Sequence, residues 1–344
     1  MKKIQLTGLA LATLAACAPA WAQSTVTIYG AVDMALGRVN YLDSTNIRPG
    51  KIGLQSSSAV NLQDSFVGFR GVEDLGGGTQ LGFQLEQKLD ASSGTADPEG
   101  AFARSANLWL GGGWGRLILG RATTPSYNAM ASWDLMAAGN NSIANATYGA
   151  VGFNTTKRES NQIGYRLPRF GGLTLEMSYI PKDENILAGA NRSRFDAGVT
   201  YKNEGLTFGV AYNKTSGMDA NYALGAKYIY QNFEFSGGYY HSRYGVYSEE
   251  KQRLIVVDSD GTLNGLTIGG KVNLGQLSLG LDVARDVKSE YTRLSVPGVR
   301  FDGKKYTSAV ISGVYSLSKR TSLYANYMRR ENFNNYGVGI SHSF

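Results

Sequence analysis

The sequence predicts an all-β fold, a 16-stranded antiparallel transmembrane β-barrel, and three observations lead to this class. Apolar and polar residues alternate with a period of two in segments of about ten residues. The apolar faces carry Tyr and Phe near the segment ends, while the opposite faces carry Gly, Ser, Asn and isolated charges. Short and long connections alternate along the chain. Alternation alone also suits a soluble sandwich, but aromatic ends and a small, polar second face favour a membrane barrel with a wet lumen.

The alternation is clearest in four segments: 173–179, 206–213, 277–283 and 335–344. In the last segment, Tyr336, Val338 and Ile340 share one face, whereas Gly and Ser residues occupy the other. A membrane barrel must close, because an open edge would leave unpaired backbone groups in lipid. We therefore expect each segment to be one strand of a closed sheet.

The connections give the strand number. Seven short turns are expected at 74–78, 111–115, 168–172, 203–205, 231–232, 274–276 and 318–320. Eight longer connections are expected near 40–62, 89–101, 122–157, 181–193, 214–219, 243–262, 287–300 and 330–334. This alternation predicts 16 strands, although the boundaries within 40–62 and 243–262 also allow 14 or 18. Outer-membrane barrels have short periplasmic turns, long outer loops and an even strand number.

The first 22 residues are expected to be a secretory signal peptide. Lys2 and Lys3 precede an apolar stretch too short to span a bilayer, and Ala20 and Ala22 form a small-x-small cleavage signal. Cleavage would leave a barrel domain of residues 23–344 and lower the formal net charge from +7 to +5. One alternative stays open, in which Cys17 is acylated and becomes the N-terminus of a lipid-anchored β-protein.

Composition and motifs argue against several other classes. A mean hydropathy of −0.22 and dispersed apolar residues do not suit a helical membrane protein. Two histidines and one cysteine leave no His-rich metal site or disulfide scaffold. The sequence shows no motif that pairs a nucleophile with a base, as a hydrolytic enzyme would need. The positive charge is scattered, which does not indicate nucleic-acid binding, and we expect no cofactor.

Several motifs resemble those of the trimeric general porins of β-proteobacterial outer membranes. They are residues 25–33 (TVTIYGAVD), 68–78 (GFRGVEDLGGG), 119–121 (LGR), 170–173 (FGGL), 317–321 (LSKRT) and 338–344 (VGISHSF). They match, in order, the first strand, the second strand and first turn, the lead into the third loop, the turn into the seventh strand, the last periplasmic turn and the C-terminal strand. The likeness covers essentially the whole chain after the signal peptide.

The resemblance implies a homotrimer in the Gram-negative outer membrane, in contact with lipid and lipopolysaccharide. It implies a third loop, here 122–157, that folds into the lumen as a constriction. It also implies that the barrel-assembly machinery recognises Phe344. The implied function is passive diffusion of small hydrophilic solutes and ions. The alternative is a solute-specific channel with a preferred anion or sugar.

The resemblance also supplies candidate pore residues. Arg104 and Arg158 match wall arginines of the family, and Arg70 also points inward by the alternation. Arg121 completes the predicted basic wall, although it shares the parity of outward residues and a role in anchoring the loop stays open. Asp134 is placed where the third loop offers a carboxylate to the pore. For each arginine, a structural ion pair is the competing interpretation.

Three departures from the family pattern reduce the expected influence of the basic wall on ion selectivity. Phe66 stands where an arginine is common, Ala138 where some relatives have a second loop acid, and Ser341 and Ser343 where relatives often have basic residues. The arginines still outnumber the acids near the expected constriction. The sequence therefore predicts a weak to moderate preference for anions.

Overall fold

The computed structural model describes residues 25–42, 47–48, 50–96, 100–149, 151, 157–182, 192–244, 246–248, 253–255, 261–293 and 296–344. The expected signal peptide, residues 1–22, lies outside the described residues, as does Cys17.

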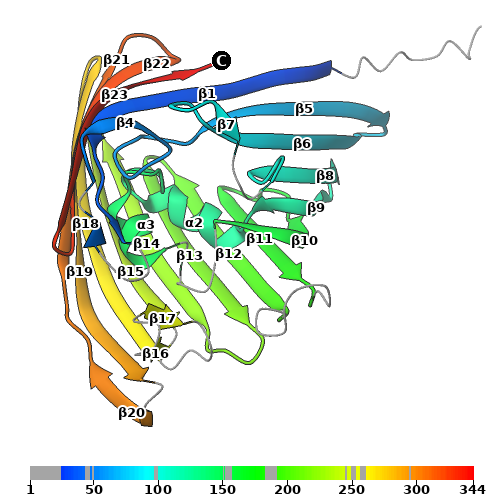
Figure 1. Ribbon diagram of the computed structural model, residues 1–344. Helices are drawn as coiled ribbons and strands as arrows, with labels where there is room; N and C mark the ends of the chain where they lie inside the picture. Colours follow the sequence, from blue (N-terminus) through cyan, green and yellow to red (C-terminus); the bar gives the residue numbers. More distant parts are fainter. Residues whose placement is uncertain are drawn as a thin grey trace, which may run out of the picture.

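Within the described residues, sixteen long antiparallel strands close into a barrel (Figure 1). In chain order they are β1 (Thr25–Arg38), β5 (Ser65–Gly76), β6 (Thr79–Asp90), β8 (Ser105–Gly112), β9 (Gly115–Thr123), β10 (Arg158–Arg166), β11 (Leu173–Ile180), β12 (Arg194–Asn203), β13 (Leu206–Thr215), β14 (Asn221–Tyr230), β15 (Phe233–Tyr244), β18 (Gly261–Leu274), β19 (Leu277–Arg293), β21 (Thr307–Ser316), β22 (Thr321–Arg330) and β23 (Phe333–Ser343). Each pairs with the next, and β23 pairs with β1 in a register that joins Ser343 to Ala31. The predicted fold class is confirmed.

Shorter strands extend the sheet or form a separate pair. They are β2 (Tyr41–Leu42), β3 (Ile47–Arg48), β4 (Gly53–Ser56), β7 (Thr95–Ala96), β16 (Val246–Ser248), β17 (Arg253–Ile255) and β20 (Val296–Asp302). The expected connections 40–62, 243–262 and 287–300 are therefore not plain loops. In 287–300, β19 continues to Arg293 and pairs with β20, where the rings of Tyr291 and Phe301 stack at 5.8 Å. All seven expected short turns do join adjacent barrel strands.

The alternation of side chains sets the two faces of the barrel. On β13, Leu206, Phe208 and Val210 are exposed on the outer face, whereas the residues between them are buried inside. Because side chains of a strand alternate, each barrel strand presents one row outward and the other to the lumen. Neither of the two helices described next is long and apolar enough to cross a membrane.

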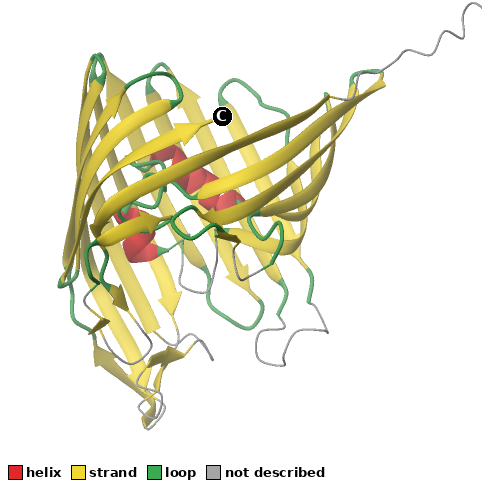
Figure 2. Ribbon diagram, turned by 45° about the horizontal axis from the view of Figure 1, so that its top comes forward, coloured by secondary structure: helices red, strands yellow, loops and turns green. Residues whose placement is uncertain are grey.

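The described part of the connection between β9 and β10 lies inside the barrel and contains helices α2 (Pro125–Trp133) and α3 (Ile143–Tyr148) (Figure 2). The hydroxyl of Thr124 caps α2 by accepting from the backbone N–H of Tyr127, and Pro125 stands at the first helical position. Ser142 caps α3 in the same way. The apolar residues of this connection show no helical periodicity, because these short helices are covered on several sides.

Aromatic side chains hold this connection against the wall formed by β12–β15 and β18. The ring of Trp133 is fully buried and lies over Gly209 and Gly225, where an added Cβ would overlap it. Trp133 Nε1 donates to the hydroxyl of Tyr240 at 3.2 Å, and Tyr240 stacks on Tyr148 at 4.7 Å. We call Gly209 and Gly225 the glycine notch. This packing leaves the opposite side of the lumen open.

Candidate functional site

The open side of the lumen contains a recess of about 330 Å³ between α2 and the wall of β6, β8, β9, β10 and β11. A recess of this size can hold a small solute. Its charged lining residues are Arg104, Arg116, Arg158, Arg166, Glu86 and Glu176. The arginines outnumber the glutamates by two, so the recess presents a net positive lining.

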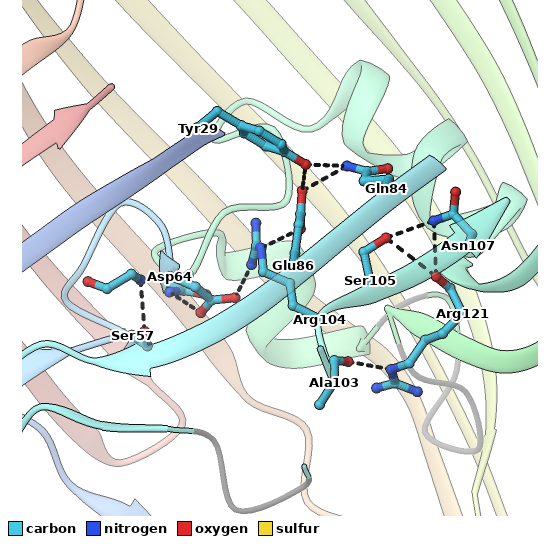
Figure 3. A network of polar contacts seen from close by, with 12 residues as sticks. Tyr29, Ser57, Asp64, Gln84, Glu86, Ala103, Arg104, Ser105, Asn107 and Arg121 are labelled. Carbon is cyan, nitrogen blue, oxygen red and sulfur yellow. Dashed lines mark hydrogen bonds and ion pairs between the residues drawn. The ribbon is translucent and has the colours of Figure 1, made fainter. Parts of the chain in front are cut away.

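Arg104 lies at the recess in an ion-paired network (Figure 3). Its guanidinium contacts Asp64 at 2.5 Å and Glu86 at 2.8 Å, and it lies 4.2 Å from the ring centroid of Phe66. The side chain is only 14% exposed. Phe66, at a position where the resemblance implies an arginine, therefore supports Arg104 by a cation–π contact. Arg104 lines the lumen as expected, but two carboxylates offset its charge.

Asp64 is the main acid that the sequence reasoning missed. It follows a segment that bends inward after β4, where Asn61 Nδ2 donates to Asp33 Oδ1 at 2.8 Å. Asn140 lies in the connection between β9 and β10, called the inner connection below. It donates to Asp64 Oδ1 at 3.0 Å, so Asp64 joins this connection to Arg104. Burial alone would raise the pKa of the Asp64 carboxyl, but the Arg104 guanidinium and the Asn140 amide hold it below its ordinary value. Asp64 is therefore ionised at neutral pH.

Lys157 and Arg158 lie where the chain leaves the inner connection. Arg158 begins β10 opposite Thr123 and lines the recess, as expected from the resemblance. The Lys157 ammonium lies 6.0 Å from the ring centroid of Tyr127. Burial, with the nearby positive charges of Arg158 and Arg104, lowers the pKa of Lys157 to about 8. Lys157 is thus a basic group of the site that titrates near physiological pH.

Arg70 points inward, as the alternation predicts. Its guanidinium carbon lies 4.7 Å from the ring centroid of Tyr29. The Tyr29 hydroxyl donates to Glu86 at 2.7 Å, and Glu86 lines the recess, so Arg70 faces the lumen beside it. Among the residues that the structure describes, no carboxylate forms an ion pair with Arg70.

Arg121 does not belong to the basic wall, and this part of the prediction is wrong. It pairs with Ala106 on the outer face that also carries Leu119, which is 43% exposed. Its Nε donates to the carbonyl of Ala103 (Figure 3). Its Nη1 donates to Ser160 Oγ at 3.0 Å. The alternation fixes this direction, so Arg121 anchors the ends of neighbouring strands instead of lining the lumen.

Asp134 is not presented to the lumen either, which corrects the second expectation. It follows α2 and is 3% exposed. Its Oδ2 accepts from the backbone N–H groups of Ala138 at 2.7 Å and Met136 at 3.1 Å. Burial raises the pKa of the Asp134 carboxyl despite these bonds. The side chain forms the turn after α2, because a carboxylate there satisfies two backbone donors.

Arg116 and Arg166 are recess residues that the sequence reasoning did not select. Arg116 lies 3.8 Å from the ring centroid of Trp109, and Arg166 pairs with Glu176 at 3.0 Å. Both arginines fall on lumen-facing positions of the alternation within 115–123 and 158–166, and this could have indicated them as pore residues. On the adjoining wall, three lysines also lie on inward positions: Lys202, Lys227 and Lys271. Glu234 pairs with Lys271 at 2.8 Å, so the three lysines still leave an excess of positive charge toward the short turns.

The described ranges contain no group of three or more His, Cys, Asp or Glu residues arranged to hold a metal ion. Phe344, the expected assembly signal, lies at the end of β23. Its backbone N donates to Gly30 O at 3.1 Å, and its carbonyl accepts from Gly30 N at 3.3 Å. Phe344 thus forms the last pair of the β1–β23 seam.

Comparisons with known proteins agree with this geometry. A family model described as Gram-negative porin matches residues 8–335. Outer membrane porin protein 32 of Delftia acidovorans is 30% identical over 331 residues, which cover 92% of this chain and 87% of that protein. An outer membrane porin protein of Bordetella pertussis is 28% identical over 397 residues, with 100% of each chain covered. An anion-selective porin from Comamonas acidovorans has the same fold, with a TM-score of 0.72 at 24% identity, covering 94% of this chain and 100% of that one.

Proposed function

The chain belongs to the Gram-negative porin family, and from this premise we propose that it is a homotrimeric diffusion channel with a weak to moderate preference for anions. The protein is an outer-membrane porin, and its barrel crosses the outer membrane of a Gram-negative cell. Small hydrophilic solutes and ions pass down their gradients without bond chemistry, so we assign no catalytic step and no cofactor. Contacts with lipopolysaccharide and with the barrel-assembly machinery are part of the proposal.

The observation that carries the anion preference is the charge of the recess beside α2. Four arginines and two glutamates line it, and Arg70 and Lys157 lie close by. At physiological salt the screening length is about 8 Å, so an excess of positive charge at the wall attracts a passing anion. The preference is moderate because Asp64 and Glu86 offset Arg104. The Comamonas acidovorans relative, described as anion-selective, is consistent with this direction.

The test is the reversal potential of single channels in a gradient of potassium chloride. We expect the reversal potential of wild type to lie toward the equilibrium potential of chloride. The preference for chloride should shrink at about 1 M salt, where the screening length falls to about 3 Å. Arg158→Glu is expected to move the potential toward that of potassium without loss of trimer on unheated gels. A wild-type channel that favours potassium at low salt would refute the anion preference.

The alternative is a solute-specific channel with a preferred anion or sugar. An anion is favoured by the arginines of the recess. A sugar is less favoured, because Trp133 of the loop is fully buried and the ring of Trp109, which lines the recess, is covered by Arg116 at 3.8 Å. Saturable block of the current by a single solute, with no block by other anions of similar size, would support the specific channel over general diffusion.

We further propose that residues 122–157 form the constriction and that export removes residues 1–22. The mature N-terminus is expected at Gln23, because Ala20 and Ala22 fit the peptidase and a strand starts at Thr25. The intact mass of protein from outer membranes measures this directly. A mass that corresponds to a chain starting at Cys17 with added acyl chains would instead support the lipid-anchored form.

A further inference from the structure

Two arginines face each other directly across two neighbouring strands. Arg116 on β9 and Arg166 on β10 are partners in the antiparallel register, so their side chains emerge side by side on the lumen face. Both line the recess and also a second hollow that continues toward the short turns. Like charges directly opposite on a sheet are destabilising. The pair therefore requires compensation by negative charge.

The described residues compensate only one of the two arginines. Glu176 accepts from Arg166 at 3.0 Å, and its other oxygen accepts from Asn128 of α2 at 2.9 Å. The Arg166 side chain is still 42% exposed beside Glu176, so part of its guanidinium remains accessible. Within the described part of the chain, no carboxylate pairs with Arg116. The site thus keeps donors that an incoming anion can use.

Arg116 is also held in a fixed orientation. Its guanidinium lies 3.8 Å from the centroid of the Trp109 ring. Trp109 in turn lies flat on Gly82, where any Cβ would overlap the indole. A stacked guanidinium keeps its planar set of donors free at the edge, and that set matches the oxygens of a carboxylate or phosphate. Arg116 therefore loses little conformational entropy when an anion binds, because its orientation is already fixed.

We propose that Arg116 and Arg166 form a binding subsite for small oxyanions, in which one carboxylate or phosphate group lies between the two guanidinium groups. The inference rests on the proposed function as an anion-preferring porin and adds the solute class and the place. The subsite lies on the side of the short turns, which face the periplasm in outer-membrane barrels. A solute that has passed α2 meets it before leaving the lumen.

The experiment measures block of chloride current through single channels at low salt, with inorganic phosphate or succinate as the added probe. Wild type is expected to show saturable block by both. Arg116→Gln should raise the half-blocking concentration about tenfold or more, since a charge-assisted hydrogen bond contributes that much. Arg116→Lys keeps the charge but loses the planar donors, so it should weaken block while the reversal potential in potassium chloride stays unchanged.

Arg70→Gln is the matched control, because it removes another lumen arginine that is stacked on an aromatic ring. It is expected to reduce the chloride preference and to leave the half-blocking concentration of phosphate unchanged. Equal weakening of block in Arg70→Gln and Arg116→Gln would overturn the subsite, since block would then reflect general charge. Trimers on unheated gels show that each variant is folded.

The two proposals fail in different ways. Chloride preference without saturable block in wild type would overturn the subsite and leave the proposed function intact. Saturable block that is lost in Arg116→Gln, in a channel that nevertheless prefers potassium, would uphold the subsite and refute the general anion preference. Block by phosphate but not by succinate would overturn the shared oxyanion chemistry.

Discussion

At the level of single residues, Asp64 and Asp134 differ in their partners and in the direction of their pKa shifts. Asp64 lies beside Arg104 at the recess and stays ionised, whereas Asp134 is enclosed under the turn after α2. Parity along a strand was enough to predict that Arg70 faces the lumen. It could not reveal the Arg104–Asp64 pair, because the two residues are forty positions apart and meet only when the sheet closes. Nor could it reveal that Asp134 bonds to its own turn.

A matched pair of substitutions tests this difference. Asp64→Asn removes a negative charge at the recess and frees Arg104, so it should move the reversal potential further toward that of chloride. Asp134→Asn makes the same formal change at a buried carboxyl with a raised pKa, so the potential should stay close to wild type. Single-channel reversal potentials decide the outcome. A larger shift in Asp134→Asn would restore it as the acid of the constriction.

We expect Lys157 to make the proposed anion preference depend on pH. Its pKa is lowered to about 8, so the ammonium is charged below that pH and loses its charge as the pH rises through it. The chloride preference should therefore decrease between about pH 7 and 9. Lys157→Arg keeps its charge throughout this range and should abolish the decrease. An identical pH dependence in wild type and Lys157→Arg would assign the effect to another group.

At the level of elements, strands and turns follow from local sequence, but the inner connection does not. Period-two alternation and glycine-rich turns predicted the strand order because each strand is apolar on one face only. Thr124 and Pro125 are a local signal for the start of α2, which a search for periodicity overlooks. The direction in which the connection folds depends on Trp133 and on glycines of strands far along the chain. Sequence spacing does not show that contact.

The glycine notch can be tested by adding one methyl group. In Gly225→Ala the Cβ would overlap the Trp133 ring, and overpacking of this kind costs about 1–3 kcal/mol. We expect a changed single-channel conductance and a lower temperature of trimer dissociation, because α2 must shift. Gly270→Ala is the control on β18, since its Cβ would meet no atom closer than 3.8 Å. Equal effects in both variants would show that Trp133 does not hold the loop.

At the level of the whole molecule, closure depends on the pairing of the first and last strands. The seam runs from Arg38 with Tyr336 to Ala31 with Ser343, and Phe344 adds two backbone hydrogen bonds to Gly30. The sequence predicted this closure because a barrel in lipid can leave no edge unpaired. The outward ring of Phe344 is 45% exposed, so it adds little burial to the folded barrel.

Deletion of Phe344 should lower the amount of folded trimer in the outer membrane by more than the seam alone explains. Two backbone hydrogen bonds contribute about 0.5–1.5 kcal/mol each, which is small against a closed barrel. Phe344→Ala keeps both bonds and removes only the ring, which lies against Gly30 with its Cζ 2.7 Å from where a Cβ would stand. If the assembly machinery recognises the ring, Phe344→Ala should be as deficient as the deletion on unheated gels of outer membranes. Both variants should then refold in detergent as well as wild type, because that reaction lacks the machinery. Normal trimer levels in Phe344→Ala cells would instead limit the role of this residue to the seam.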